Sequence, residues 1–154
     1  DLGSAPYGYG SAGTRQLLRD IGATIDLAEI DLWFWGDDHY AALFDAVPGQ
    51  APFIGSCIGH GGYPGTLQRP GRASFAPVRW LEDAPRFPAD HPIRTDVGNN
   101  GWCELGFAAG GGVDLRYVDW LSVERYRVAY RRGADGRLAA TGEARPARGP
   151  AARY

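Results

Sequence analysis

The sequence predicts a single domain of the α/β (α+β) class that becomes β-rich in its C-terminal third. In the first half, one segment with helical periodicity is followed by short apolar runs that stop at glycines. From residue 102 to residue 141, apolar and polar residues alternate, which is typical of strands with one buried face. The 23 glycines and 11 prolines indicate many turns and disfavour a helical bundle.

The first half is expected to contain one helix and two buried strands. Residues 1–12 are predicted to form a loop because they are mainly Gly, Ser, Tyr and Pro. Thr14–Ile21 has its leucines and isoleucine on one face and charged residues on the other, and Gly22 ends this predicted helix. Leu32–Trp35 and Phe53–Ile58 are short apolar runs that stop at glycine, so we interpret both as buried strands.

Residues 65–100 combine several prolines with little periodicity. They are therefore predicted to form a long loop region, with Trp80 and Leu81 as its anchors in the core.

The C-terminal third predicts two hairpins. Trp102–Phe107 and Val113–Asp119 flank a glycine-rich turn, and their alternation predicts one buried face and one mostly exposed face. Val123–Arg131 and Leu138–Thr141 predict a second hairpin.

We expect the domain to span residues 1–141 and residues 142–154 to be a disordered tail of Ala, Arg and Pro. The chain has no Met and opens on Asp1, so we expect it to be a piece of a longer protein.

Composition restricts the partners and the compartment. A net charge of −2 gives no reason to expect nucleic acid or an anionic membrane, and no apolar run reaches the ~18 residues that span a bilayer. Cys57 and Cys103 lie in apolar, strand-like contexts outside any metal-binding spacing. We interpret them as free thiols in a reducing compartment, which favours the cytoplasm, although a disulfide between them is the alternative.

The chemistry of the sequence concentrates where the two predicted strands end. The first is followed by Gly36-Asp37-Asp38-His39 and the second by Gly59-His60-Gly61-Gly62. Asp37 and His39 are one residue apart and are expected to reach one site, where a carboxylate and an imidazole suit Zn, Mn or Fe.

Two ligands bind a metal weakly, and a functional site needs three or more. The possible additional ligands are His60, Asp31, Asp38 and His91. Two simpler interpretations stay open: a solvated Asp-Asp-His turn that accepts backbone N–H bonds, and a structural role for His60.

Together these segments resemble a known family. The order Ile30–Tyr40, Cys57–Pro64, Asn100-Gly101-Trp102 and a hairpin that ends at Asp119 is similar to the C-terminal half of calcineurin-like metallophosphoesterases, over about residues 12 to 131. It is most similar to a bacterial branch in which a Trp-Gly-His-Glu-His-like segment precedes an Ile-Gly-His-Gly-Gly-like one.

The resemblance implies part of a β-sandwich flanked by helices, with a two-metal centre that clamps a phosphoester substrate at the strand ends. The family's last metal motif, Gly-His-x-His, matches Gly36–His39. His39 then stands for the second His ligand, and Asp37 occupies the position of the first. Asp38, His60 and Gly61 are expected to lie next to the metal ligands or to belong to the substrate loop.

The upstream ligand motifs of the family, Asp-x-His, Gly-Asp-x-x-Asp and Gly-Asn-His-Asp, do not precede this segment. We therefore expect a metal-dependent phosphoester hydrolase that is present here as an incomplete, inactive C-terminal portion, and its catalytic residues stay unassigned. A dinuclear centre would form only if the missing motifs were supplied.

Two alternatives belong to other functional classes. One is a non-catalytic, phosphoesterase-like binding or regulatory module, indicated by the Asp in place of His. The other is a free-standing β-rich domain that binds ligands through Trp and Tyr. If the chain forms only half of a β-sandwich, it is also expected to self-associate through an exposed sheet edge.

Overall fold

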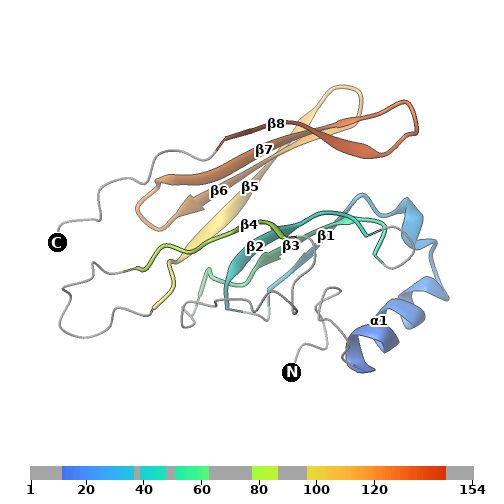
Figure 1. The fold of residues 1–154 in the computed structure, drawn as a ribbon, viewed down its shortest axis with the longest axis horizontal. Coiled ribbons are helices and arrows are strands. Elements are labelled where there is room, and N and C mark those ends of the chain that lie inside the picture. The colour runs from blue at the N-terminus through green and yellow to red at the C-terminus, as the bar shows by residue number, and fades with distance from the viewer. Residues whose placement is uncertain (1–11, 37–38, 48–50, 63–77, 87–96, 145–154) are drawn as a thin grey trace.

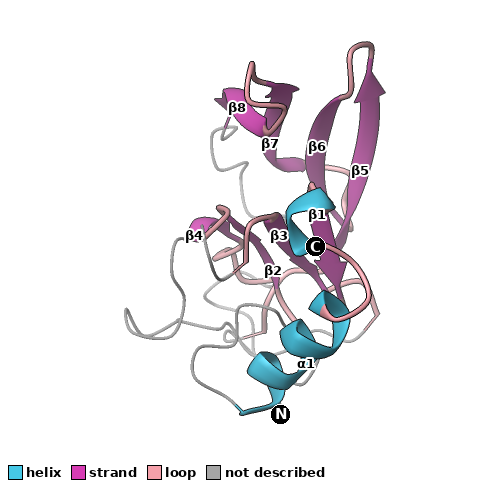
Figure 2. Cartoon of the chain, turned by 90° about the vertical axis from the view of Figure 1, so that its right-hand side faces the viewer, coloured by secondary structure: helices cyan, strands magenta, loops and turns pink. Residues whose placement is uncertain are grey.

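The fold consists of two stacked β-sheets with a helix on one side. The computed structural model describes residues 12–36, 39–47, 51–62, 78–86 and 97–144. Within this part, two four-stranded sheets face each other, and the helix α1 (Ala12–Gly22) lies against the outer face of the first sheet (Figure 1, Figure 2). The predicted α+β class with a β-rich C-terminal third is therefore confirmed.

The first sheet has the strand order β1-β3-β2-β4. Its members are β1 (Leu32–Trp35), β2 (Ala41–Phe44), β3 (Ile54–Ile58) and β4 (Val78–Leu81). Strand β1 runs parallel to β3, whereas β2 is antiparallel to both β3 and β4. All residues of β2 are buried because this strand has neighbours on both edges and layers on both faces.

The second sheet is an antiparallel meander in the order β5-β6-β7-β8. Its members are β5 (Gly101–Ala108), β6 (Gly112–Asp119), β7 (Glu124–Arg132) and β8 (Leu138–Ala144). Both predicted hairpins are confirmed. Gly110 and Gly111, with φ of 76°, close the first hairpin in a conformation that favours glycine.

The main core lies between the two sheets. Buried side chains from β2, β3 and β4 pack against alternate residues of β6 and β7. This cluster consists of Ala41, Leu43, Ile54, Trp80, Val113, Leu115, Tyr117, Tyr126, Val128 and Tyr130. Trp80 lies at its centre, stacked on Tyr126 with ring centroids 5.3 Å apart and tilted against Tyr117 at 4.6 Å. Such aromatic contacts stabilise a core beyond the area that they bury.

A smaller core covers the other face of the first sheet. Trp35, Phe44 and Phe53 form it together with Leu18 from α1 and Leu27 from a short 3-10 helix. The helix predicted over Thr14–Ile21 is therefore confirmed, and its apolar side contacts the sheet as expected.

Just before β1, the chain forms the 3-10 helix η1 (Leu27–Glu29). The carboxylate of Asp26 caps it by accepting a hydrogen bond from the Ala28 amide at 2.9 Å.

The loop predicted over residues 65–100 contains a strand that the sequence analysis missed. Val78–Leu81 forms β4 and pairs with β2. Four residues next to a proline are too short for the alternation that identifies a strand. The anchoring role predicted for Trp80 and Leu81 is confirmed, because both side chains pack into the cores.

The predicted domain end at residue 141 is also wrong by a few residues. Strand β8 continues to Ala144, and Glu143 accepts hydrogen bonds from Arg79 and Tyr126. The last three residues of β8 carry no apolar pattern and are not held by burial. They are held by backbone pairing with β7 and by these polar contacts. Residues 145–154 of the predicted tail lie outside the described residues.

Both cysteines are free thiols in the structure. Burial raises the pKa of the Cys103 thiol to about 12, so this group stays protonated at neutral pH. None of the described helices is long and apolar enough to cross a bilayer.

One polar contact crosses the main core. The hydroxyls of Ser56 in β3 and Tyr117 in β6 lie 2.7 Å apart, and both residues are fully buried. We expect Tyr117→Phe to lower the free energy of unfolding by about 1–3 kcal/mol, because the Ser56 hydroxyl would remain buried without this partner. Urea unfolding measures the loss.

The double variant Ser56→Ala/Tyr117→Phe is the control for this prediction, because it removes both polar groups. Its loss should be smaller than the sum of the two single losses. Strict additivity would contradict a direct interaction between the two hydroxyls.

Candidate functional site

The two chemical segments identified in the sequence begin side by side. Parallel pairing sets Trp35 at the end of β1 opposite Cys57 near the end of β3. A Cβ placed on Gly36 would lie 4.0 Å from the Cα of Gly59, so the backbones stay close beyond the paired residues. The carboxyl ends of neighbouring strands are a common position for ligand sites in open sheets. The predicted convergence of the two segments is therefore present at the level of the backbone.

His39 lies where the first segment enters β2. Its side chain is exposed, directly before Tyr40 and the buried strand β2. Asp37 and Asp38 lie outside the described residues, so of the predicted Asp37–His39 pair only the histidine is described.

His60 has a different environment because it is buried, with 4% of its surface exposed. Its backbone carbonyl accepts hydrogen bonds from the Asn100 side chain at 3.0 Å and from the Gly101 amide at 3.4 Å. Burial lowers the pKa of the imidazole, and a backbone contact with Ile58 offsets this only in part. The ring is therefore neutral at pH 7.

The Nδ1 atom of His60 is buried and has no hydrogen-bond partner among the described residues. His60 was expected to act either as a ligand or as a structural residue. In the structure its backbone carbonyl holds the turn, while its Nδ1 atom has no hydrogen-bond partner among the described residues.

The glycines around His60 are less constrained than their density suggested. Gly61 and Gly62 are exposed, and neither adopts the left-handed backbone conformation. A Cβ on Gly62 would meet nothing within 4 Å. Among the described residues, this turn is therefore open at Gly62, whereas a Cβ on Gly61 would lie 3.5 Å from the Gly101 carbonyl oxygen.

The residue that requires glycine is Gly101, at the start of β5. A Cβ there would lie 2.2 Å from the Val118 carbonyl oxygen and 2.9 Å from Nε2 of His60. No side chain fits between these groups. The segment Asn100-Gly101 therefore links the second sheet to the His60 turn.

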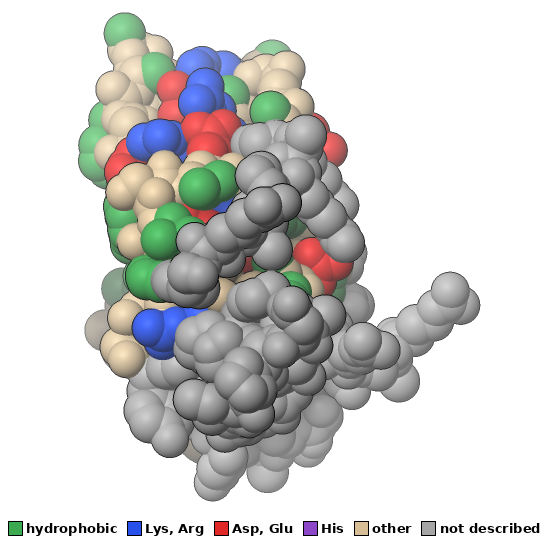
Figure 3. Space-filling model, turned by 90° about the vertical axis from the view of Figure 1, so that its left-hand side faces the viewer, with side chains coloured by type: hydrophobic (Ala, Val, Ile, Leu, Met, Phe, Trp, Pro, Cys, Tyr) green, Lys and Arg blue, Asp and Glu red, His purple; other side chains and the backbone are tan. Residues whose placement is uncertain are grey.

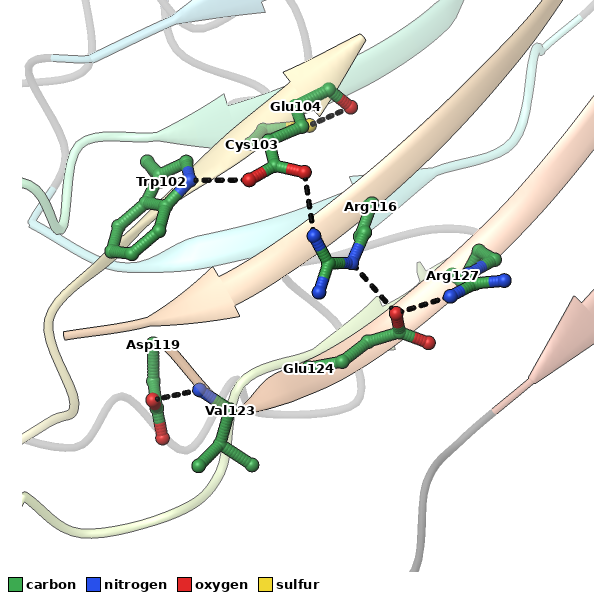
Figure 4. Close-up of polar contacts among 8 residues, drawn as sticks. All are labelled: Trp102, Cys103, Glu104, Arg116, Asp119, Val123, Glu124 and Arg127. Carbon is green, nitrogen blue, oxygen red and sulfur yellow. Dashed lines mark hydrogen bonds and ion pairs between the residues drawn. The ribbon is translucent and has the colours of Figure 1, made fainter. Parts of the chain in front are cut away.

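Polar residues that the sequence analysis did not single out surround this link. Arg86 donates to the Asn100 side chain at 2.8 Å, and its guanidinium lies 5.0 Å from the Trp120 ring centroid. Asp119 accepts from the Leu121 and Val123 amides at 2.9 and 2.8 Å, which orders the turn between β6 and β7 (Figure 4). Arg86, in a loop, and Asp119, at the end of β6, carry no spacing signal that marks a site, so the sequence could not identify them.

Asp31, one of the possible additional ligands, is held at the opposite end of β1. It precedes the strand and forms an ion pair with Arg132, whose Nη2 lies 2.6 Å from its carboxylate. It therefore does not join His39, and His91 lies outside the described residues. Among the described residues, no three His, Cys, Asp or Glu side chains gather in a way that could hold a metal ion.

The outer face of the second sheet is charged rather than apolar. Arg116 bridges Glu104 and Glu124 at 2.8 and 2.7 Å, and Arg127 also contacts Glu124 (Figure 4). Figure 3 shows basic and acidic side chains interleaved over one face of the molecule. Such exposed pairs contribute little to stability.

Comparison of the chain with protein-family models, with curated proteins and with solved structures returned no match. The resemblance to calcineurin-like enzymes therefore rests on the sequence motifs alone.

The first prediction from this site concerns the link at Gly101. We expect Gly101→Ala to lower the free energy of unfolding by about 3 kcal/mol or more, because the new methyl group overlaps the Val118 carbonyl. Gly142→Ala in β8 is the matched control. Its Cβ would meet nothing within 4 Å, so stability should rise by up to about 1 kcal/mol. Equal effects of the two substitutions in urea unfolding would contradict a special role for Gly101.

The second prediction concerns pH. Because the folded pKa of His60 lies below its ordinary value of 6.5, the unfolded chain binds the proton first as the pH falls. The contribution of this histidine to stability is therefore present above pH 6.5 and is lost as the pH falls from 6.5 through the folded pKa. We expect His60→Gln to flatten the decline of the unfolding free energy between pH 7.5 and pH values below 6.5.

Glu82 changes the pH dependence of the unfolding free energy in the opposite direction. Burial raises the pKa of its carboxyl group, and the contact with Arg125 offsets this only in part. It is present in both proteins, so its effect cancels in the comparison. Identical pH profiles for the wild type and His60→Gln would show that His60 is not held neutral by the fold.

Proposed function

We propose that this chain is the C-terminal portion of a metal-dependent phosphoester hydrolase of the calcineurin-like class. In this proposal His39 and Asp37 are metal ligands at the carboxyl ends of β1 and β3, and Asp38, His60 and Gly61 lie beside the metal or the substrate. The observation that carries the proposal is the close approach of Gly36 and Gly59, which starts both motif segments at one edge of the first sheet.

The two-layer architecture supports the proposal in a coarser way. Two sheets with a helix on one outer face are compatible with part of a β-sandwich flanked by helices. As far as the described residues go, His39 is exposed and Gly62 is open on its outer side, which supports a ligand position at this edge.

The residues present fit a metal site only in part. His39 offers one exposed imidazole, and neutral His60 has a ring nitrogen without a hydrogen-bond partner among the described residues. A functional site needs three or more ligands, and the described residues do not bring three together. We therefore propose that this chain supplies one or two ligands to a larger centre and that it is inactive or nearly inactive alone. A complete centre would polarise phosphoryl oxygens and lower the pKa of bound water.

The prediction from this proposal is weak metal binding that depends on His39. Titration with Co²⁺ or Zn²⁺ should show one weak site, and His39→Ala should weaken it by about tenfold or more. Asp31→Asn is the control, because Asp31 is held by Arg132 at the opposite end of β1 and its change is expected to leave binding unchanged. Equal losses in the two variants would contradict a ligand role for His39.

Activity is tested on the same protein. The chain should not hydrolyse a chromogenic phosphodiester in the presence of Mn²⁺. Robust turnover with stoichiometric metal would contradict the claim that the site is incomplete.

A non-catalytic binding or regulatory module is the second candidate, favoured by the aspartate at position 37 where the family motif has histidine. The variant Asp37→His separates the two candidates. If position 37 is a ligand, an imidazole there should shift the preference from Mn²⁺ toward Zn²⁺. An unchanged metal preference would favour the module.

A further inference from the structure

The outer edge of the second sheet, formed by β5, has no strand partner among the described residues. Natural proteins protect such edges with prolines, lysines or bulges. Trp102–Ala108 contains no proline or basic residue, and its pairing with β6 runs without a bulge. Figure 2 shows β5 and β6 extending together beyond the first sheet. Within the described part of the chain, this edge is therefore long, regular and open to another strand.

The same edge exposes apolar side chains on the inner face of the second sheet. Along β6 and β7, this face packs into the main core. Leu105 lies opposite Leu115 and Phe107 lies opposite Val113, and both partners in β6 are buried in the main core. However, Leu105 is 41% exposed and Phe107 is 83% exposed. The apolar face of the sheet thus continues past the part that the first sheet covers.

The sequence of β5 is complementary to itself in one register. A two-fold axis perpendicular to the sheet keeps both faces continuous and places one residue opposite its own copy. With Glu104 on the axis, two carboxylates would face each other, which is destabilising. With Gly106 on the axis, only Glu104–Ala108 would pair. With Leu105 on the axis, all of Trp102–Ala108 pairs and like charges are avoided.

Existing contacts of Glu104 favour the same register. Its carboxylate accepts hydrogen bonds from Nε1 of Trp102 at 3.0 Å and from Arg116 at 2.8 Å (Figure 4). In the register centred on Leu105, Glu104 lies opposite Gly106 of the second copy, which has no side chain to disturb these bonds. On the inner face, the two copies of Leu105 meet, and Phe107 lies opposite Cys103.

We propose that β5 pairs antiparallel with β5 of a second copy of this chain, centred on Leu105, so that the second sheets of two copies form one continuous sheet. This pairing satisfies the open backbone edge and covers Leu105 and Phe107 with apolar partners.

Light scattering combined with size-exclusion chromatography tests the dimer at micromolar concentrations. The wild-type chain should be a dimer, and Leu105→Lys should raise its dissociation constant by about tenfold or more, because two lysines would meet at the axis. Ile25→Lys is the matched control, since Ile25 is 46% exposed but lies in the turn after α1, away from β5. It should leave the dimer intact, and circular dichroism checks that both variants fold.

Cross-linking tests the register without relying on a destabilising change. In Leu105→Cys the two introduced thiols lie opposite each other, so oxidation should give a covalent dimer. Gly106→Cys should not, because position 106 faces Glu104 of the other copy. The native thiols give little background, since Cys57 is buried and the pKa of Cys103 is raised to about 12.

Three results would overturn the proposal. A monomeric wild-type chain would show that the edge is not used between copies and leave it for a strand of another protein. A dimer that resists Leu105→Lys would show that another surface holds the two copies together. Cross-linking through Gly106→Cys but not through Leu105→Cys would show a different register.

Discussion

The structure depends on the close contact between Gly101 and the turn that carries His60. At this point the second sheet begins, and its first residue has no room for a side chain between the Val118 carbonyl and the imidazole. The Asn100 side chain and the Gly101 amide both donate to the His60 carbonyl, so the turn after β3 is fixed to the strand that starts the meander. The same turn lies beside the end of β1. The geometry of the candidate site is therefore set by the junction of the two sheets.

This constraint connects stability to the proposed chemistry. His60 is buried and neutral at this junction, and its Nδ1 atom has no hydrogen-bond partner within the described part of the chain. The exposed His39, in contrast, contributes little to packing. His60 therefore fixes the loop, whereas His39 faces solvent.

The parts of the fold with strong local patterns were predictable from the sequence. Val113, Leu115 and Tyr117 alternate with charged neighbours, so the first hairpin and its buried face followed directly. Strand β4 was not predictable, since four residues show no period and β2 supplies its pairing from a distance. At the candidate site, the parallel pairing of β1 with β3 explains why the segments that begin at Gly36 and Gly59 start side by side. The fixed position of Gly101 depends on contacts with Val118 and His60, which only the folded chain brings together.

The central claim is that the ends of β1 and β3 form one metal-binding edge. Paramagnetic broadening of backbone amide signals by substoichiometric Mn²⁺ tests it most directly, because broadening reports distance from the bound ion. The account predicts that signals from Gly36, His39 and Gly59–Gly62 broaden first, while those of Leu138–Ala144 in β8 stay sharp. Broadening centred on the charged outer face around Glu104 and Glu124, or none at any position, would contradict it.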